Sequence, residues 1–191
     1  EGSRKTPTNL QFKLTVTTLN HLQLKGSGNV FVKPLKVEDL TVALEGIGGV
    51  RLFSIKGEDV TLRMSGTGDI QVAKLAAEEV TAVLSGTGDI YIGKLDSEEA
   101  EFVLKGTGDM RVQDEGETES LEINLVGSGD IDLMPLKAEE VEINIMGSGT
   151  ARVFATSELE VNILGSGDVY YRGDPEIERS IIGAGEIYRE D

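Results

Sequence analysis

The sequence predicts an all-β fold, a right-handed single-stranded parallel β-helix (solenoid) of about nine coils of 18–21 residues. The first observation behind this prediction is a Gly-x-Gly pair that recurs along the chain. The pairs begin at residues 26, 46, 66, 86, 106, 127, 147, 165 and 183, at intervals of 20, 20, 20, 20, 21, 20, 18 and 18 residues. Repeats of this length are typical of solenoids, in which each coil packs on its neighbours.

The second observation is the alternation of apolar and polar residues around each glycine pair. In residues 80–92 the even positions are apolar or glycine, from Val80 to Ile92, and most odd positions are polar. A period of two indicates a strand with one buried face. Polar turns containing Glu-Glu or Ser-Glu close the coils, and a leucine in each turn is expected to pack into a corner: Leu35, Leu75, Leu95 and Leu136. Stacked coils of this kind form parallel sheets with right-handed connections.

A single domain spanning residues 1–191 is expected. Residues 1–19, in which Leu10, Phe12, Leu14 and Val16 alternate, are expected to form an N-terminal partial coil or cap. Residues 20–182 should form the coils and residues 183–191 a charged C-terminal cap that protects the open end from edge pairing. The acidic stretch 114–120, within the one 21-residue interval, is expected to bulge as a loop.

The glycine pairs are the predicted corners of the coils. An interior glycine in a strand costs roughly 0.5–1 kcal/mol relative to alanine, so a repeated glycine implies a backbone requirement. Both glycines fall on inward positions of the alternation, where a Cβ would crowd the interior of a sharp bend. The corner residues predicted in this way are Gly26, Gly28, Gly66, Gly68, Gly86, Gly88, Gly106, Gly108, Gly127, Gly129, Gly147, Gly149, Gly165 and Gly167.

Composition excludes several classes of protein. The chain of 191 residues has 34 acidic and 18 basic residues, a net charge of −16, and no cysteine. It can therefore have no disulfide, thiol nucleophile or thiolate zinc site, and it lacks the basic surplus that nucleic-acid binding needs. No apolar run approaches the ~18 residues of a membrane span. Membrane association is expected only through a removed signal or a lipid anchor.

The repeated motif carries a family resemblance. Residues 84–92, 104–112 and 125–133 follow the pattern Leu-x-Gly-Ser/Thr-Gly-Asp-Ile-x-Val/Ile with few departures, and residues 165–175 and 182–187 end the chain in variants of it. This pattern, in register from about Leu19 onward, resembles the GIN-domain family, the head domain of auto-transporter adhesins known mainly from secreted or surface proteins of Bacteroidetes. The resemblance implies an extracellular or cell-envelope location, in the periplasm or on the outer surface, and an adhesin role. Gly49 and Thr150 depart from the family's aspartate at the fourth motif position.

That fourth position forms a carboxylate ladder, which is densest at Asp69, Asp89 and Asp109. These three residues are the candidates for a weak calcium site. Calcium takes six to eight oxygen ligands, however, and one carboxylate per coil at about 4.8 Å supplies few of them. The simpler expectation is that each aspartate accepts backbone N–H bonds at its own glycine corner, without a cofactor.

The residue pattern offers no catalytic group. The Ser/Thr column between the glycines lacks a base, because His21 is the only histidine. Asp109 and Arg111 are the nearest approach to the Asp/Arg clusters of polysaccharide-cleaving β-helices, but a surface ion pair that contributes little explains them better. We therefore expect no enzyme, with a polysaccharide-binding or polysaccharide-degrading β-helix as the alternative.

One outward column changes character along the chain. Immediately before the first glycine, the residue is Lys25, Glu45, Ser65, Ser85 or Lys105 in the first five coils and Val126, Met146, Leu164 or Ile182 in the last four. An asparagine ladder (Asn124, Asn144 and Asn162) and a glutamate rim (Glu101, Glu122, Glu142, Glu160 and Glu178) border this stripe. Apolar patches with polar rims mark partner surfaces.

The sequence thus predicts a non-enzymatic interaction module that binds through extended faces, with a protein or a surface glycan as partner. A homo-oligomer through the apolar stripe is also expected. A scaffold that self-assembles end to end is a third hypothesis, and the charged C-terminal end argues against it.

Overall fold

The computed structural model describes residues 11–190, and these contain fifteen strands and no helix. No segment among them is therefore a helix long and apolar enough to cross a membrane. The strands are β1 (His21–Gly26), β2 (Asn29–Val32), β3 (Leu35–Lys36), β4 (Asp39–Gly46), β5 (Gly49–Lys56), β6 (Asp59–Gly66), β7 (Asp69–Gly86), β8 (Asp89–Gly106), β9 (Met110–Val112), β10 (Gly116–Gly127), β11 (Ile131–Gly147), β12 (Thr150–Gly165), β13 (Asp168–Arg172), β14 (Glu176–Gly183) and β15 (Ile187–Arg189).

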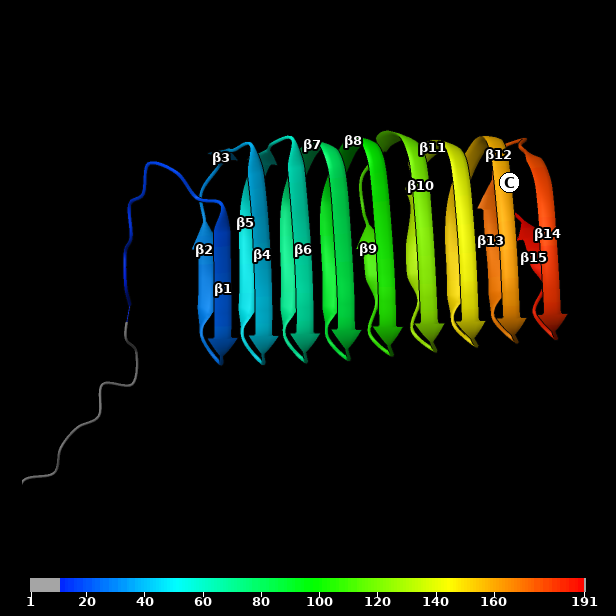
Figure 1. Cartoon of the computed structure of the whole chain (residues 1–191), viewed down its shortest axis with the longest axis horizontal. Coiled ribbons are helices and arrows are strands. Elements are labelled where there is room, and N and C mark those ends of the chain that lie inside the picture. The colour runs from blue at the N-terminus through cyan, green and yellow to red at the C-terminus, as the bar shows by residue number, and fades with distance from the viewer. Residues whose placement is uncertain (1–10, 191) are drawn as a thin grey trace, which may run out of the picture.

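The chain winds into the predicted right-handed parallel β-helix, a straight rod with one end at β1 and the other at β14 and β15 (Figure 1). We call the strand segments that precede each glycine pair face A. They stack in the order β1, β4, β6, β7, β8, β10, β11, β12, β14, and every pair is parallel. The segments that follow the glycine pairs form face B, which ends with β13 and β15. The rod makes about eight turns, close to the nine coils predicted.

The interior is filled by columns of aliphatic residues, one residue per coil. On face A one such column is fully buried: Val42, Leu62, Ala82, Phe102, Ile123, Ile143 and Val161. The small Ala82 lies beside the large Phe102, so adjacent layers compensate in volume. The turn leucines Leu75, Leu95 and Leu136 are buried in corners, as predicted, whereas Leu35 in the first coil is half-buried.

The glycine pairs lie where face A turns into face B, and their two positions differ. The first glycine of each pair has a positive φ, for example 152° at Gly86, and is half-buried in the interior coils. Only the second glycine is buried there. A Cβ on Gly88 would lie 1.9 Å from the carbonyl oxygen of Gly68 and 2.8 Å from the Met64 side chain. The tightest constraint therefore lies between the backbones of successive coils, and crowding of the interior, which the sequence predicted, is secondary.

The 21-residue coil agrees with the prediction only in part. The acidic stretch 114–120 was expected to bulge, but only residues 113–115 leave the strands, in an exposed bend, and β10 begins at Gly116 and pairs with β8 and β11. Gly116 occupies the corner column between Leu95 and Leu136, and Thr118 is buried opposite Ala138. Ser97 donates a 3.0 Å hydrogen bond to the Thr118 hydroxyl, which lies 3.1 Å from the Glu98 carbonyl oxygen. The extra residue is taken up in the exposed bend at 113–115, and small inward residues keep the rest of the stretch in the sheet.

The two ends of the rod are not alike. Residues 11–20 of the expected N-terminal partial coil form no strand, and Phe12, Leu14 and Val16 are exposed. Leu10 and the rest of residues 1–10 lie outside the described residues. At the other end, β14 and β15 continue the register of the coils, but Arg179 and Arg189 take inward positions next to Val161 and Tyr171.

The corner geometry predicts a contrast between two equivalent glycines. Gly88→Ala should lower the free energy of unfolding by about 3 kcal/mol or more, because its Cβ meets a carbonyl oxygen that cannot move away. Gly28→Ala, at the same motif position in the first coil, meets only Leu24 at 3.6 Å and should change the stability by less than about 1 kcal/mol. Thermal and urea unfolding followed by circular dichroism measures both. Equal losses would show that the corners are not held by contact between coils.

Candidate interaction surface

The apolar stripe is one continuous column on face A. Val126, Met146, Leu164 and Ile182 are register partners in β10, β11, β12 and β14. Their exposed fractions are 41%, 54%, 51% and 67%. The same column holds Ser65 and Ser85 in the N-terminal half of the rod. Parallel stacking in strict register therefore joins four apolar residues, far apart in sequence, into a single strip.

An asparagine ladder runs along one side of the apolar stripe. Asn144 donates a hydrogen bond from Nδ2 to Oδ1 of Asn124 at 3.3 Å, and Asn162 donates in the same way to Asn144 at 3.2 Å. Ser180 continues this column in the last coil. Because the side chains bond along the rod axis, their rotamers are fixed before any ligand arrives.

The glutamate rim is bonded to this ladder. Within each coil the asparagine Nδ2 also donates to a glutamate Oε1: Asn124 to Glu122 at 2.6 Å, Asn144 to Glu142 at 2.8 Å and Asn162 to Glu160 at 3.0 Å. Both N–H groups of Asn144 and Asn162 are thus used, one along the rod and one across it. The result is an ordered strip with apolar, amide and carboxylate columns side by side.

The aspartate ladder of face B serves the backbone, in a different way from the prediction. Asp89 accepts a hydrogen bond at 2.9 Å from the backbone N–H of Asp109, which lies in the next coil. Asp109 accepts from the N–H of Asp130 at 3.3 Å, and Asp130 from that of Thr150 at 3.1 Å. The carboxylates were expected to bond at their own corners. They bond one coil further on, because the next coil presents the nearest N–H group.

The second carboxylate oxygens are also engaged. Asp89 accepts a hydrogen bond from the Tyr91 hydroxyl at 2.9 Å. The pKa of Tyr91 is raised, mainly because the hydroxyl is partly buried and secondly because of this hydrogen bond. Asp109 forms an ion pair of 2.8 Å with Arg111, in which both side chains are partly exposed. Within residues 11–190, no group of three or more His, Asp or Glu side chains is arranged to hold a metal ion. The calcium candidates Asp69, Asp89 and Asp109 thus lie one per coil.

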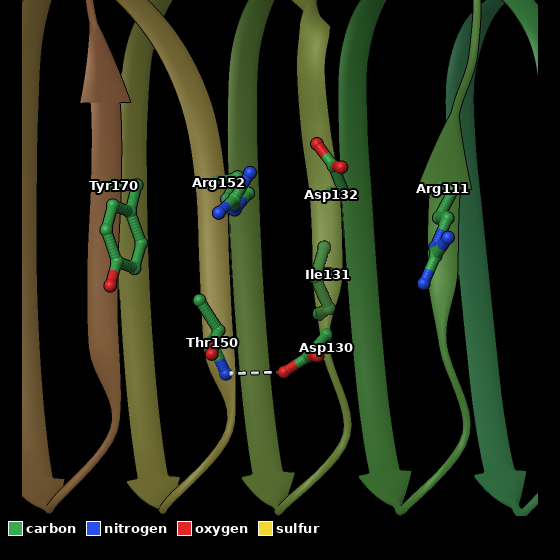
Figure 2. Close-up of a pocket in the computed structure, with 7 residues that line it drawn as sticks. All are labelled: Arg111, Asp130, Ile131, Asp132, Thr150, Arg152 and Tyr170. Atoms are coloured by element: carbon green, nitrogen blue, oxygen red, sulfur yellow. Dashed lines mark hydrogen bonds between the residues drawn. The ribbon is translucent and has the colours of Figure 1, made fainter. Parts of the chain in front are cut away.

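An open depression of about 310 Å³ lies on face B, around Arg111, Asp132, Arg152 and Tyr170 (Figure 2). Asp132 lies between the two arginines in register. The Arg152 guanidinium lies 5.0 Å from the centre of the Tyr170 ring, which stacks on Tyr188 at 5.0 Å. A hydrogen bond to Glu186 raises the pKa of Tyr188 to about 12. The depression offers guanidinium donors and an aromatic edge, with a carboxylate between the donors.

Sequence reasoning identified the columns but missed two features. It did not identify the hydrogen bonds that join one aspartate to the next coil, although a short acceptor at the same position in many coils was a signal. It also missed a second depression, lined by Lys94, Asp96, Met134, Lys137, Phe154 and Arg172 among others. Those residues lie in several coils, and nothing in the repeat marks them.

The fold and its columns define the class of protein, a repetitive parallel β-helix whose distinctive surfaces are extended outward ladders. The chain belongs to the family described as "Putative auto-transporter adhesin, head GIN domain", which matches residues 1–115 and 75–175. The resemblance seen in the sequence motif is thereby confirmed. No curated protein matches the sequence.

Solved structures share the fold at low sequence identity. A putative adhesin from Parabacteroides distasonis superposes with a TM-score of 0.87 at 17% identity, covering 93% of this chain and 94% of that one. A putative adhesin from Parabacteroides merdae gives 0.83 at 16% identity, covering 93% and 94%. A putative lipid binding protein from Parabacteroides distasonis gives 0.81 at 19% identity, covering 93% and 95%. These likenesses establish the fold alone.

The aspartate ladder predicts a stabilising role that does not depend on metal. Asp109→Ala should lower the free energy of unfolding by about 1–2 kcal/mol, because the Asp130 N–H and Arg111 both lose their acceptor. Asp109→Asn keeps an acceptor oxygen and should lose less than half as much. Thermal unfolding in EDTA and in millimolar calcium measures both variants. A midpoint that rises with calcium in the wild type and not in Asp109→Asn would contradict this role and indicate a metal site.

Proposed function

We propose that this protein is a non-enzymatic, adhesin-like interaction module of the cell envelope or the extracellular space, which binds a protein ligand through the apolar stripe of face A. Membership of the family described as an auto-transporter adhesin head supports an adhesin-like role outside the cytoplasm. The observation that carries the proposal is the stripe itself, four apolar side chains in register beside a hydrogen-bonded asparagine ladder.

This surface has the composition of a protein interface. Its centre is apolar, its border is polar, and the polar side chains are already ordered, so that little conformational entropy is lost on binding. The residues flanking the stripe in the same coils are amides and carboxylates, and Glu122, Glu142 and Glu160 place negative charge along the rim. Electrostatic complementarity therefore favours a ligand whose apolar contact patch is bordered by lysine or arginine.

Two other occupants are less well matched. A second copy of this chain would bring another acidic surface to the stripe, and the net charge of −16 per chain opposes that contact. A surface glycan would use the depression on face B instead. There Arg111 is paired with Asp109, and Arg152 lies 3.6 Å from Glu190, so both guanidinium groups already have carboxylate partners.

A pair of double variants tests the stripe. Val126→Lys with Leu164→Lys places two positive charges in the apolar stripe. The control, Ser65→Lys with Ser85→Lys, adds two lysines to the same outward column in the N-terminal half of the rod. Binding is measured to immobilised mucin, to extracellular-matrix proteins and to a glycan array. The stripe variant should lose protein binding by about tenfold or more and the control by less than about twofold.

The alternatives give distinct results. Glycan binding that survives in both double variants but is lost in Arg111→Ala with Arg152→Ala would move the site to face B. A homo-oligomer in sedimentation velocity that only the stripe variant abolishes would make a second copy the occupant. Equal protein binding by the wild type and both double variants would overturn the proposal.

A further inference from the structure

Charge is distributed very unevenly along the chain. Residues 1–37 contain six lysines and arginines and a single acidic residue, a net charge of +5. Residues 38–191 contain 12 basic and 33 acidic residues, a net charge of −21. Within residues 11–37, the part of this stretch that the structure describes, there are four lysines and no acidic residue. Because the coils stack in sequence order, these lysines lie at one end of an otherwise acidic rod, the end at β1 in Figure 1.

The basic residues lie at the surface of the first coil and of the segment that leads into it. Lys33 directly follows β2, Lys36 ends β3 and Lys13 lies ahead of β1, and all three are exposed. Lys25 forms an exposed ion pair with Glu45 at 3.1 Å and is already partly neutralised. Three lysines of residues 11–37 therefore lack a carboxylate partner among the ion pairs of the described residues, and Arg51 and Lys56 lie beside Phe31 and Lys36 in the next coil.

The same end is apolar. Phe12, Leu14, Val16 and Phe31 are 78%, 87%, 58% and 70% exposed. The inward residues of the first coil, including Leu22 and Leu24, are only half-buried, whereas their register partners Val42 and Leu44 are fully buried. Exposed apolar side chains and exposed lysines thus occur together at this end, and the Arg51 guanidinium, 5.8 Å from the centre of the Phe31 ring, adds a further cation beside them.

The opposite end of the rod has charged residues at inward positions. Inward Arg179 and Arg189 lie at the last coil, and Arg189 forms an ion pair of 3.3 Å with Asp174. If a second copy continued the β-helix in register, Arg179 would be buried against Leu22 and Arg189 against Val32. Burying a guanidinium against an aliphatic side chain is costly, and inward-pointing charges are a known protection of sheet edges. The occupant of the basic end is therefore not the acidic end of another copy.

We propose that the N-terminal end of the rod, from Phe12 to Lys36, docks on an anionic lipid surface. Lys13, Lys33 and Lys36 would contact lipid phosphates, while Phe12, Leu14 and Phe31 enter the interfacial layer. Basic residues near an anionic bilayer attract it, and adjacent apolar side chains add affinity by leaving water. The anionic lipid repels the acidic coils that follow residue 37, so the rod points away from the membrane. The apolar stripe then lies in the half of the rod that is farther from the lipid. This inference does not depend on the stripe's own ligand.

Vesicle sedimentation tests the docking. The folded wild type should bind vesicles of phosphatidylcholine with about a third phosphatidylglycerol and not vesicles of phosphatidylcholine alone, and binding should weaken steeply above about 0.1 M salt. Lys13→Glu, Lys33→Glu and Lys36→Glu combined should lower the affinity by about tenfold or more. The matched control, Lys74→Glu, Lys105→Glu and Lys137→Glu combined, makes the same change of net charge on the body, away from the first coil, and should lower it by less than about threefold.

A second variant separates a lipid surface from other polyanions. Phe12→Ser with Phe31→Ser should weaken binding to the anionic vesicles and leave binding to soluble dextran sulfate unchanged. The proposal is overturned if the wild type ignores anionic vesicles, if the two lysine variants lose affinity equally, or if the phenylalanine variant binds vesicles as the wild type does. A self-associated species without lipid that the first lysine variant abolishes would also overturn it, in favour of a second copy.

Discussion

The whole structure depends on the close contact between the backbones of successive coils at the glycine corners. An added Cβ at the second glycine would lie about 2 Å from the carbonyl oxygen of the preceding coil, as at Gly68 (2.0 Å) and Gly108 (1.9 Å). Only glycine permits this approach, and the first glycine also takes a left-handed backbone that other residues rarely adopt. The corner fixes the register of every coil on the one before it. A residue at a given motif position therefore lies directly beside its equivalents, and any chemical property repeated in the sequence becomes a column on the surface.

These columns link the fold to function. Repetition of asparagine gives a ladder whose amides bond along the rod, repetition of aspartate gives acceptors for the N–H groups of the next coil, and the change from polar residues to Val126, Met146, Leu164 and Ile182 gives an interface-like strip. The rod has no need of a deep pocket to present such surfaces. Its two ends, by contrast, break the repetition, with lysines and exposed apolar residues at one and inward arginines at the other. An extended side and a distinct end suit a molecule that is held at one place and makes contact at another.

Much of this architecture could be predicted from the sequence, because the glycine spacing and the period-two alternation are both direct consequences of the corner contact. The outward columns could be predicted as well, because strict register places residues at the same motif position in neighbouring coils side by side. Other features depend on atoms that the repeat does not specify. The hydrogen bond from the Asp109 N–H to the Asp89 carboxylate depends on the direction of the backbone amide in the next coil. The whole stretch 114–120 was expected to bulge, but the bend is confined to residues 113–115, and the rest stays within the sheet because Gly116 and Thr118 are small enough for inward positions. The inward placement of Arg179 and Arg189 became visible only with the pairing of the last coil.

Amide hydrogen exchange at the corners tests the central claim most directly. The residues between the glycines, such as Thr87 and Thr107, are exposed, but their N–H groups donate to the carbonyl oxygens of Gly66 and Gly86 in the preceding coil at 3.0 and 3.1 Å. If coil-to-coil contact at the corners holds the rod together, these amides should exchange as slowly as those of the buried strands on either side, despite their exposure to water. Rapid exchange at Thr87 and Thr107, with slow exchange confined to the strands, would show that the corners open freely and would contradict the account.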